Sequence, residues 1–473
     1  FSGEWSGTSK LNKYDLSSMY FNYAGSIYSQ NFPIIDIVMN TMLKQEESTQ
    51  GRHFFRMFNG MGDDQRAAAY LNGKSFEQAV LDNTLSTEVF YEMMKLKGVY
   101  LRNYINSRLS SNEFKEFMAE FMKKYQFQEV NFTRLNSEFI RKFHFNLMDF
   151  IPNWYTINST PRFIVKGVDA DQVEIGDYTK YIVKFQVYNP TNVEGVISVN
   201  VEEGGGMFPG GPRGRRGRAA QMESKPAKNY IIEPRKYKEI RILCDERPSN
   251  LTINTNISQN LPSTIMQNFA KVTTTTTDTV TGIFDSNAAL FTFNPKEITV
   301  DNEDPGFRII ESNQKNKLQS FFKKESEDKY KNLNFWMPPS KWTATIGVNY
   351  YGDYINSAVY KKSGSGSNKT EWTTQIQIPG FYEVFVYTSE LPMMGWRRRG
   401  SEEKKMQYYT VKHDDGEEEI SVETGRGRQG WMTLGSFYFS AGEAKITLSD
   451  KGSESNQIIF ADAVKWVYTN NNK

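Results

Sequence analysis

Asp301-Asn302-Glu303-Asp304-Pro305-Gly306-Phe307 opens the part of the chain that decides the fold, and Trp431-Met432-Thr433-Leu434-Gly435-Ser436-Phe437-Tyr438-Phe439 lies near its end. Between and beyond them, runs such as 381–387, 406–412 and 444–449 alternate apolar and polar residues, the period of strands with one buried face. Turn residues such as Asp414-Asp415-Gly416 separate these runs. Because no long helical pattern interrupts them, residues 296–473 are predicted to form a jelly-roll or related β-sandwich.

The pattern of the preceding stretch, residues 158–295, also predicts β-structure. Runs at 162–166, 181–188, 195–201, 237–244 and 251–255 are short and rich in β-branched residues. They predict a small Ig-like β-sandwich, with Asn189-Pro190-Thr191-Asn192 as a hairpin turn. The single cysteine, Cys244, excludes an intramolecular disulfide and is predicted to be a buried strand residue. Residues 203–218 are rich in Gly and Arg and predict a solvated loop rather than an RNA-binding element, because no aromatic residues are interleaved with the arginines.

Residues 1–157 have a helical pattern instead. Apolar residues between 114 and 125 recur at i, i+3, i+4, i+7, i+8 and i+11, which places them on one helical face. Ser110 with Glu113 and Ser75 with Gln78 predict helix starts, as does Ser86. At 473 residues and roughly 150 residues per domain, the chain is predicted to be a multidomain α + β protein. Its order is an N-terminal helical bundle (1–157), a middle Ig-like β-sandwich (158–295) and a C-terminal jelly-roll β-sandwich (296–473).

Composition excludes some classes of function. Charged residues make up 24% of the chain and nearly balance at a net charge of +2, so nucleic acid is not an expected partner. The longest apolar runs fall well below the roughly 18 residues of a membrane span, so no transmembrane segment is predicted.

Motifs for catalysis are missing from the sequence. The three histidines, His53, His144 and His413, have no His-Glu-x-x-His spacing, and His144 between two phenylalanines is predicted to be packed. There is no Gly-x-Ser-x-Gly elbow, triad signature or P-loop, so the chain as given is not expected to be an enzyme and no cofactor is implied. Asp301, Glu303 and Asp304 could form a cation site. The favoured interpretation is that Asp304-Pro305-Gly306 is a turn whose acids cap backbone amides.

Six blocks in order give residues 298–469 a resemblance to the golvesin C-terminal domain, also called the xanthan-lyase carbohydrate-binding-like domain. The blocks are Val300 to Phe307, Tyr351-Gly352-Asp353-Tyr354, Gly380 to Tyr387, Tyr409 to Gly416, Gly430 to Phe439 and Ala461 to Val467. Such domains are β-sandwich modules at the ends of secreted or surface bacterial proteins. The resemblance therefore implies an extracytoplasmic protein, in the periplasm, on the outer-membrane surface or secreted, with an accessory tail that binds glycans.

The helical region has a fainter resemblance to the C-terminal part of the catalytic half of aminopeptidase-N-like gluzincin metallopeptidases. It is carried by Lys97-Gly98, Asn112-Glu113-Phe114, Tyr125-Gln126-Phe127, Asp149-Phe150, Trp154-Tyr155 and Pro161. The zinc-binding His-Glu-x-x-His is absent from this sequence, and Lys95 stands where the family has its catalytic tyrosine. The resemblance therefore implies a non-catalytic relative or a chain whose metal site lies elsewhere.

Two functional hypotheses follow. The favoured one is a non-catalytic surface or periplasmic accessory protein that binds a glycan, a peptide or a partner subunit of a surface complex through its β-modules. The alternative is the C-terminal portion of a zinc aminopeptidase-like metallopeptidase whose metal site lies outside this chain. Sugars stack on aromatic rings, and arginine offers two parallel hydrogen-bond donors. Aromatic and arginine residues are therefore the candidate ligand contacts. These are Trp336, Trp342, Tyr350, Tyr351, Trp396, Arg397, Arg398 and Arg399, whereas Trp431 and Trp466 are assigned to the core.

Overall fold

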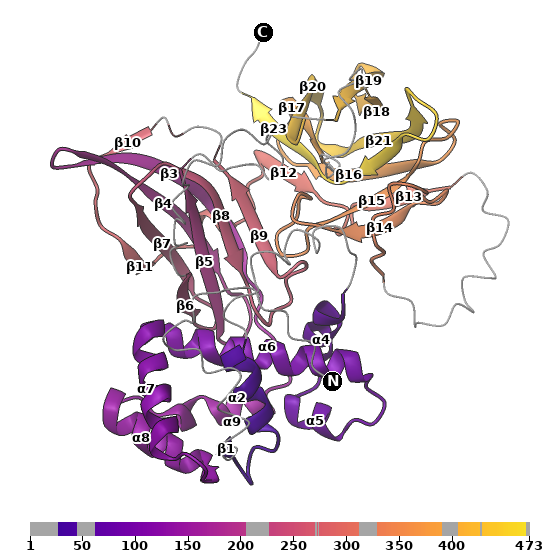
Figure 1. Ribbon diagram of the computed structural model, residues 1–473. Helices are drawn as coiled ribbons and strands as arrows, with labels where there is room; N and C mark the ends of the chain where they lie inside the picture. The colour runs from indigo at the N-terminus through magenta and orange to yellow at the C-terminus, as the bar shows by residue number, and fades with distance from the viewer. Residues whose placement is uncertain are drawn as a thin grey trace, which may run out of the picture.

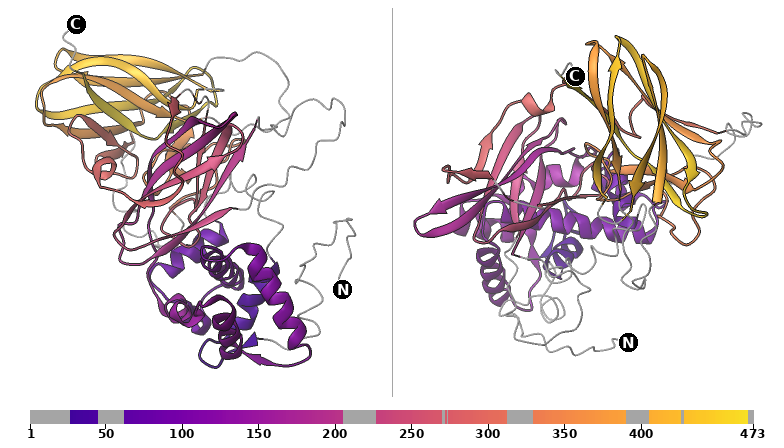
Figure 2. Two further views of the ribbon diagram at one scale, coloured as in Figure 1. Left: turned by 90° about the vertical axis from the view of Figure 1, so that its left-hand side faces the viewer. Right: turned by 90° about the horizontal axis from the view of Figure 1, so that it is seen from above.

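The fold comes from a computed structural model that describes residues 27–44, 62–204, 227–269, 272, 274–311, 329–389, 405–425 and 428–469. A helical region lies at the bottom of Figure 1, and two β-regions lie side by side above it. Figure 2 shows the same arrangement from two further directions. The multidomain α + β fold class is thereby confirmed. Among the described residues, no helix is both long and apolar enough to cross a bilayer.

The described part of the helical region begins with a short strand, Ile27–Tyr28, which pairs in parallel with Val130–Asn131 far along the chain. Three of its helices start where the sequence predicts. Ser75, Ser86 and Ser110 each accept a hydrogen bond from a backbone amide of the first helical turn, and Gln78 and Glu113 complete capping boxes. The elements are β1 (Ile27–Tyr28), α2 (Ile35–Lys44), α4 (Asp63–Leu71), α5 (Phe76–Leu81), α6 (Thr87–Asn106), α7 (Ser111–Lys124), β2 (Val130–Asn131), α8 (Phe132–Phe143), η1 (Leu147–Asp149) and α9 (Ile151–Thr156).

The apolar stripe of α7 is buried, as its spacing predicts. Phe117 lies edge-on to Phe139 of α8, with ring centroids 5.2 Å apart, and both residues are at most 4% exposed. His144 was predicted to be packed, but this prediction is wrong. It caps the C-terminal end of α8 in the left-handed conformation, at φ 54°, and it is exposed.

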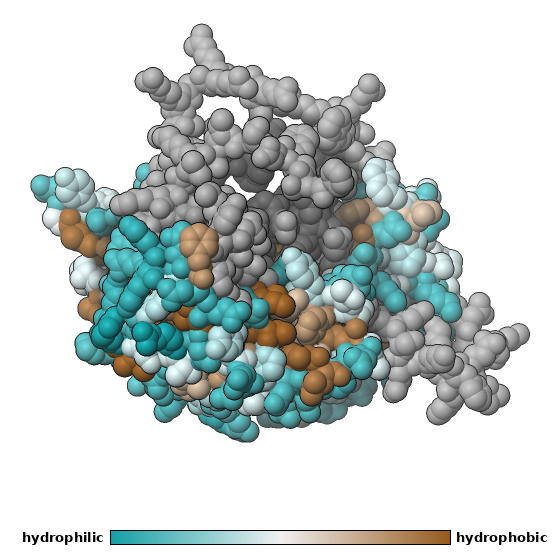
Figure 3. Space-filling model, turned by 60° about the horizontal axis from the view of Figure 1, so that its bottom comes forward, coloured by the Kyte–Doolittle hydropathy of each residue, from teal (hydrophilic) through white to brown (hydrophobic). Residues whose placement is uncertain are grey.

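Figure 3 looks onto the underside of the molecule and shows hydrophobic residues gathered near the middle of a largely hydrophilic face.

The middle region is a sandwich of two sheets. One has the strand order β10-β3-β4-β7-β11 and the other β6-β5-β8-β9. Apolar residues of both sheets, such as Phe185 and Ile253, meet between them, and Cys244 is fully buried there as predicted. The elements are β3 (Ile164–Ile175), β4 (Tyr178–Tyr188), β5 (Gly195–Glu203), β6 (Lys228–Ile232), β7 (Tyr237–Cys244), β8 (Pro248–Asn254), β9 (Thr264–Asn268), β10 (Thr274–Thr276), β11 (Gly282–Asp285) and η2 (Ala289–Phe291).

Residues 189–192 do not form the predicted hairpin, because β4 and β5 belong to different sheets. Asn189 is fully buried at the crossing between the sheets. Its amide donates to the carbonyl oxygens of Val193 (2.8 Å) and Ile232 (3.2 Å), and its oxygen accepts from the amide of Thr191 (3.1 Å). These bonds satisfy the buried Asn189 side chain in a turn that connects the two layers. Local turn propensity cannot distinguish such a turn from a hairpin.

The C-terminal region is the second of the two β-regions and has its own core. One sheet has the order β12-β23-β17-β20, a second β13-β16-β21-β18-β19 and a third β14-β15-β22. Trp372 and Trp466 are fully buried among these sheets, which confirms the core assignment of Trp466. The strands are β12 (Glu297–Val300), β13 (Phe307–Ile310), β14 (Thr343–Ile346), β15 (Ser357–Lys362), β16 (Lys369–Ile376), β17 (Gly380–Thr388), β18 (Lys405–His413), β19 (Gly416–Thr424), β20 (Gly430–Phe439), β21 (Gly442–Gly452), β22 (Ile458–Ala461) and β23 (Val464–Thr469).

Candidate functional site

The structure separates the predicted ligand contacts into three groups. Trp336 is 75% exposed, so its ring can be reached from solvent, and Tyr351 is half-buried. Trp342 and Tyr350 are only 8% and 7% exposed, which corrects their selection as ligand contacts. Trp342 belongs to the main core of the C-terminal region, and the Tyr350 ring packs 5.9 Å from that of Phe460. Trp396, Arg397, Arg398 and Arg399 lie outside the described residues.

Trp336 stands on a loop that is fixed by its neighbours. The Asn334 side-chain oxygen accepts from the backbone amides of Trp336 (3.2 Å) and Met337 (2.9 Å), which closes an Asx-type turn. The Tyr360 hydroxyl oxygen accepts from the Asn334 amide at 3.1 Å, and its proton goes to the Asn332 carbonyl at 2.9 Å. The exposed indole is therefore carried by a backbone that these hydrogen bonds hold in one conformation.

A second aromatic surface covers the outer side of the sheet β12-β23-β17-β20. Residues alternate across each strand, so Val384 and Val386 of β17 point into the core while their neighbours face outward. The outward rings of β17 and β20, together with the adjacent Tyr351, are all half-buried. We call them the aromatic face: Phe381, Phe385, Tyr387, Trp431, Tyr438 and Tyr351.

The centre of the aromatic face is a trio of rings from three separate segments. Tyr387 and Trp431 are cross-strand partners on β17 and β20, and Tyr351 comes from the loop between β14 and β15. Ring centroids are 5.3 Å apart for Tyr387 and Trp431, 5.1 Å for Tyr351 and Trp431, and 5.7 Å for Tyr351 and Tyr387. Such tilted and edge-on contacts hold the rings in one orientation. Trp431 had been assigned to the core, and its half-buried position here corrects that assignment.

Polar side chains stand between the rings of the aromatic face. Lys465 of β23 pairs with Phe385 in register, and its ammonium lies 4.6 Å from the Trp431 ring centre and 5.5 Å from that of Phe385. Thr433, beside Phe385 on β20, is exposed and donates to Glu383 at 3.4 Å. The face thus combines flat apolar surfaces with hydrogen-bond donors and acceptors at the spacing of neighbouring strands.

The rings other than Tyr351 were missed in the sequence, although a signal for them exists. In Phe381-Tyr382-Glu383-Val384-Phe385-Val386-Tyr387 every odd position falls on one face, and three of those four residues are aromatic. The alternation alone does not say which face is buried. The pairing of β17 with β20 and β23 decides that, because it directs the even positions into the core.

The acidic side chains of the predicted cation site form hydrogen bonds and an ion pair within the protein. Asp304 accepts a hydrogen bond from the Asp301 backbone amide at 2.9 Å, so the predicted capping turn is confirmed. Glu303 accepts from the Ser357 hydroxyl at 2.7 Å and forms an ion pair with Lys329. Within the described ranges, no group of three or more His, Cys, Asp and Glu side chains is arranged to hold a metal ion.

Two buried carboxyl groups nevertheless lie close to the aromatic face. Asp301 is 7% exposed and Asp462 is 2% exposed. Burial, together with nearby acids, raises the pKa of Asp301 to about 8, and burial with the charge of Asp301 raises the pKa of Asp462 well above its usual range. One Asp462 oxygen, Oδ2, accepts from the Tyr351 backbone amide at 3.2 Å. This bond fixes the backbone that carries the Tyr351 ring.

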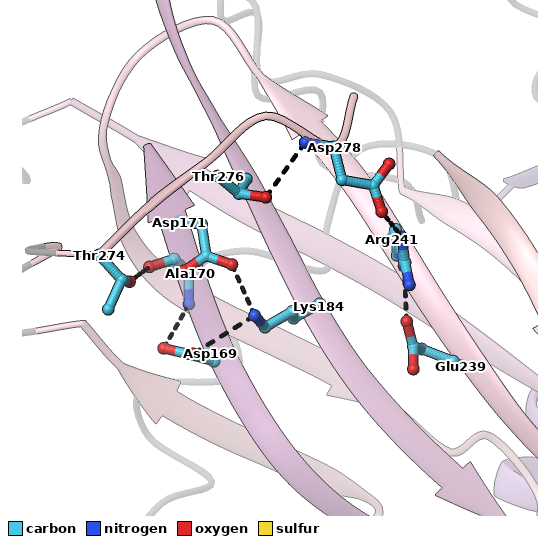
Figure 4. A network of polar contacts seen from close by, with 9 residues as sticks. All are labelled: Asp169, Ala170, Asp171, Lys184, Glu239, Arg241, Thr274, Thr276 and Asp278. Atoms are coloured by element: carbon cyan, nitrogen blue, oxygen red, sulfur yellow. Dashed lines mark hydrogen bonds and ion pairs between the residues drawn. The ribbon is translucent and has the colours of Figure 1, made fainter. Parts of the chain in front are cut away.

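Two groups of charged side chains in the described part of the middle region are paired within their own sheet. Figure 4 shows Lys184 between Asp169 and Asp171, and Arg241 between Glu239 and Asp278. In the same view the Thr274 hydroxyl donates to the Ala170 carbonyl and the Asp278 amide donates to Thr276. These contacts fasten residues 274–278 to the sheet, so this network is structural. Most of the Gly- and Arg-rich stretch, from residue 205 on, lies outside the described residues.

Comparisons with solved structures found distant likenesses. Among solved structures, the chain is similar to a Paenibacillus xanthan lyase, with 14% identity over 65% of this chain and 26% of that one and a TM-score of 0.26. An exo-beta-1,3-galactanase from Phanerochaete chrysosporium has 15% identity over 28% of this chain and 27% of its own, with a TM-score of 0.18. A two-domain protein of unknown function from Bacteroides fragilis has 10% identity over 65% and 94%, with a TM-score of 0.16. This chain thus spans 26% of the length of the xanthan lyase. No curated protein matches it.

A family model gives the specific result. The model of the golvesin C-terminal domain matches residues 331–468, which contain all the residues of the aromatic face and Trp336. The block 301–307 precedes the matched range, but its flanking strands β12 and β13 pair with β23 and β16 and complete the same sheets. The likeness of the helical region to gluzincin metallopeptidases stays a prediction. The C-terminal part of this chain therefore carries a golvesin C-terminal domain over residues 331–468.

Proposed function

We propose that the golvesin C-terminal domain binds a glycan on its aromatic face, and that the chain is a non-catalytic accessory protein outside the cytoplasm. The observation that carries the proposal is the trio Tyr351, Tyr387 and Trp431, half-buried on the open side of a sheet. Sugar rings have apolar faces of CH groups that stack on such rings, and their hydroxyl groups need donors and acceptors beside the stack. The match of residues 331–468, which include these three rings, to the golvesin C-terminal domain supports this proposal.

A glycan suits this surface better than a protein partner does. The buried centre of a protein interface is depleted of charged residues, whereas here Lys465 and Glu383 stand among the rings. Residues two apart on β17, such as Phe385 and Tyr387, are separated by about 7 Å along the strand. That spacing lets one extended sugar chain touch both rings while its hydroxyl groups reach Lys465 and Thr433.

The test is glycan binding by the whole chain and by a Trp431→Ala variant. A glycan array finds a ligand, and calorimetry then measures its dissociation constant. Trp431→Ala is expected to weaken binding about thirtyfold or more, since truncating a central aromatic anchor costs about 2 kcal/mol or more. Tyr178→Ala is the matched control, because Tyr178 is 73% exposed at the start of β4 in the middle region.

Trp336→Ala belongs in the same series. If it abolishes binding while Trp431→Ala does not, the glycan site is the Trp336 loop and the aromatic face is not used. If the array is silent but a peptide library or a partner protein binds in a Trp431-dependent way, the ligand class proposed here is wrong.

A further inference from the structure

The loop between β14 and β15 carries Tyr351 into the aromatic face and at the same time docks on the middle region. Its first part is tied to the golvesin domain, because the Tyr351 amide donates to Asp462 at 3.2 Å. Its second part is tied to the middle region through backbone hydrogen bonds. The Leu261 amide donates to the Tyr354 carbonyl at 2.8 Å, and the Asn356 amide donates to the Leu261 carbonyl at 2.7 Å.

Two side chains, one just before β3 and one within it, add to the contact between this loop and the middle region. The Arg162 guanidinium lies 4.0 Å from the centre of the Tyr354 ring, a close cation–π stack. The Lys166 ammonium lies 3.4 Å from a carboxylate oxygen of Asp353. Both contacts end within three residues of Tyr351, so their loss acts directly on the segment that carries that ring.

Arg162 is itself held in place. Its Nε and Nη2 atoms donate to the Gln259 side-chain oxygen at 3.1 and 2.8 Å. The Gln259 amide nitrogen donates in turn to the Thr160 carbonyl at 2.9 Å and to the Asn72 side chain at 3.4 Å. The guanidinium is therefore fixed by the middle and helical regions before it meets Tyr354.

The loop between β14 and β15 is closely packed on itself, so its two ends are expected to move together. A Cβ atom on Gly352 would lie 1.9 Å from the Ile355 carbonyl oxygen, so the backbone of residues 352 and 355 is in direct contact. The Asn356 side chain donates to the Tyr350 carbonyl at 2.9 Å, which closes the loop on itself. A shift at Tyr354 is thus transmitted to Tyr351 rather than lost in a flexible connection.

We propose that Arg162 and Lys166 of the middle region are positioning residues for Tyr351, so that the golvesin domain and the middle sandwich act as one binding unit. The proposal rests on the proposed glycan function for its affinity readout. Neither residue touches the aromatic face through any contact described above. Their effect on a ligand passes through the loop and through Tyr351.

The experiment is a double-mutant cycle in the full chain, with Arg162→Ala, Tyr351→Ala and the double variant. Arg162→Ala is expected to weaken glycan binding about two- to fivefold, and to have no further effect once Tyr351 is removed. Arg162→Lys keeps the charge but not the planar stack or the fork on Gln259, so it is expected to restore only part of the affinity. Lys180→Ala is the control, because Lys180 forms an exposed pair with Asp245 in the same sandwich.

Amide hydrogen exchange at Tyr351 gives a readout without ligand. Arg162→Ala and Lys166→Ala are expected to speed exchange of this amide, while Lys180→Ala leaves it unchanged. The inference is overturned if exchange at Tyr351 does not respond, or if the Arg162 and Tyr351 effects on affinity are additive. If the unaltered chain binds no glycan, the proposed function fails, and the exchange result still decides whether the middle region positions the loop.

Discussion

Lys97 and Trp154 exchange hydrogen bonds through the buried centre of the helical region. The Lys97 ammonium donates to the Trp154 carbonyl, and the Trp154 indole donates to the Lys97 carbonyl at 3.2 Å. Lys97 is 4% exposed, and its ammonium lies 5.6 Å and 5.2 Å from the ring centres of Phe76 and Trp154. Burial lowers the pKa of Lys97 from 10.5 to about 7. This pair joins α6 to α9 and brings together two sequence blocks that lie 57 residues apart.

The Lys97 pKa predicts a stability that rises with pH. Between about pH 7 and 10.5 the folded chain has released this proton while the unfolded chain still holds it. The free energy of unfolding therefore increases over this window, by up to about 1.4 kcal/mol per pH unit. Lys97→Met removes the titrating group, so its urea denaturation is expected to show a flatter pH dependence than that of the unaltered chain.

The slope, not the absolute stability, is the diagnostic quantity for Lys97. Lys97→Met also leaves the Trp154 carbonyl without its donor, a roughly constant cost of about 1–3 kcal/mol. Lys123→Met, at an exposed position of α7, serves as the control. Equal slopes for Lys97→Met and the unaltered chain between pH 7 and 10 would show that Lys97 stays charged in its buried site.

Asp301 predicts the opposite trend for the C-terminal region. Its folded pKa, raised to about 8 by burial and neighbouring acids, exceeds the unfolded value of 3.8. The folded state thus keeps a proton that the unfolded state loses between about pH 4 and 8, and stability falls as the pH rises. Asp301→Asn keeps an oxygen for the Asn302 amide, which donates to Asp301 at 2.7 Å, and is expected to flatten this decline. The measurement is chemical denaturation between pH 5 and 8, with Asp415→Asn in an exposed turn as control. An unchanged decline in Asp301→Asn would contradict the assignment.

Local signals in the sequence were sufficient for much of the fold. Ser110 and Glu113 predict the start of α7 because a capping box needs only residues three apart. The position of Trp466 in the core follows from strand alternation in the same way. Both predictions depend on neighbours along the chain, and the structure agrees with both.

The aromatic face could not be assembled from such signals. Tyr351, Tyr387 and Trp431 come from three segments, and their contacts depend on strand pairing and on the path of a loop. Trp342 and Tyr350 have the same local pattern as exposed aromatic residues, yet tertiary packing buries both. Composition selects rings that suit a ligand, but only the three-dimensional arrangement says which of them are accessible.

The buried ion pair of Lys361 and Asp450 predicts a large stability effect. It joins β15 to β21, and the two side chains are 4% and 0% exposed. Asp450 also accepts from the Gly366 amide at 2.7 Å and from Asn368 at 2.8 Å. Lys361→Met is expected to lower the free energy of unfolding by about 3–5 kcal/mol, because it leaves a buried carboxylate without its cation.

Thermal or urea denaturation tests the Lys361 prediction against a surface pair. Lys180→Met breaks the exposed contact with Asp245 and is expected to cost at most about 1 kcal/mol. Replacing both buried partners, in Lys361→Met with Asp450→Leu, is expected to recover part of the loss from the single variant. A single variant that costs no more than Lys180→Met would mean that the pair contributes little to the fold.

Substitution of Gly352 distinguishes the effect of a steric clash from that of an unfavourable backbone φ angle. Its φ is +155°, and an added Cβ would lie 1.9 Å from the Ile355 carbonyl oxygen and 2.7 Å from the carbonyl carbon. Neither atom can move without disturbing the backbone contacts of Leu261, so Gly352→Ala is expected to displace Tyr351 from Trp431. Gly442→Ala is the matched control, since Gly442 has a φ of +139° with nothing within 4 Å of the added Cβ. Both variants experience a positive φ, but only Gly352→Ala adds an overlap. Faster amide exchange at Tyr351 is therefore expected in Gly352→Ala alone, with a loss of glycan affinity. The same exchange rate in both variants would show that the loop accommodates the methyl group without moving Tyr351.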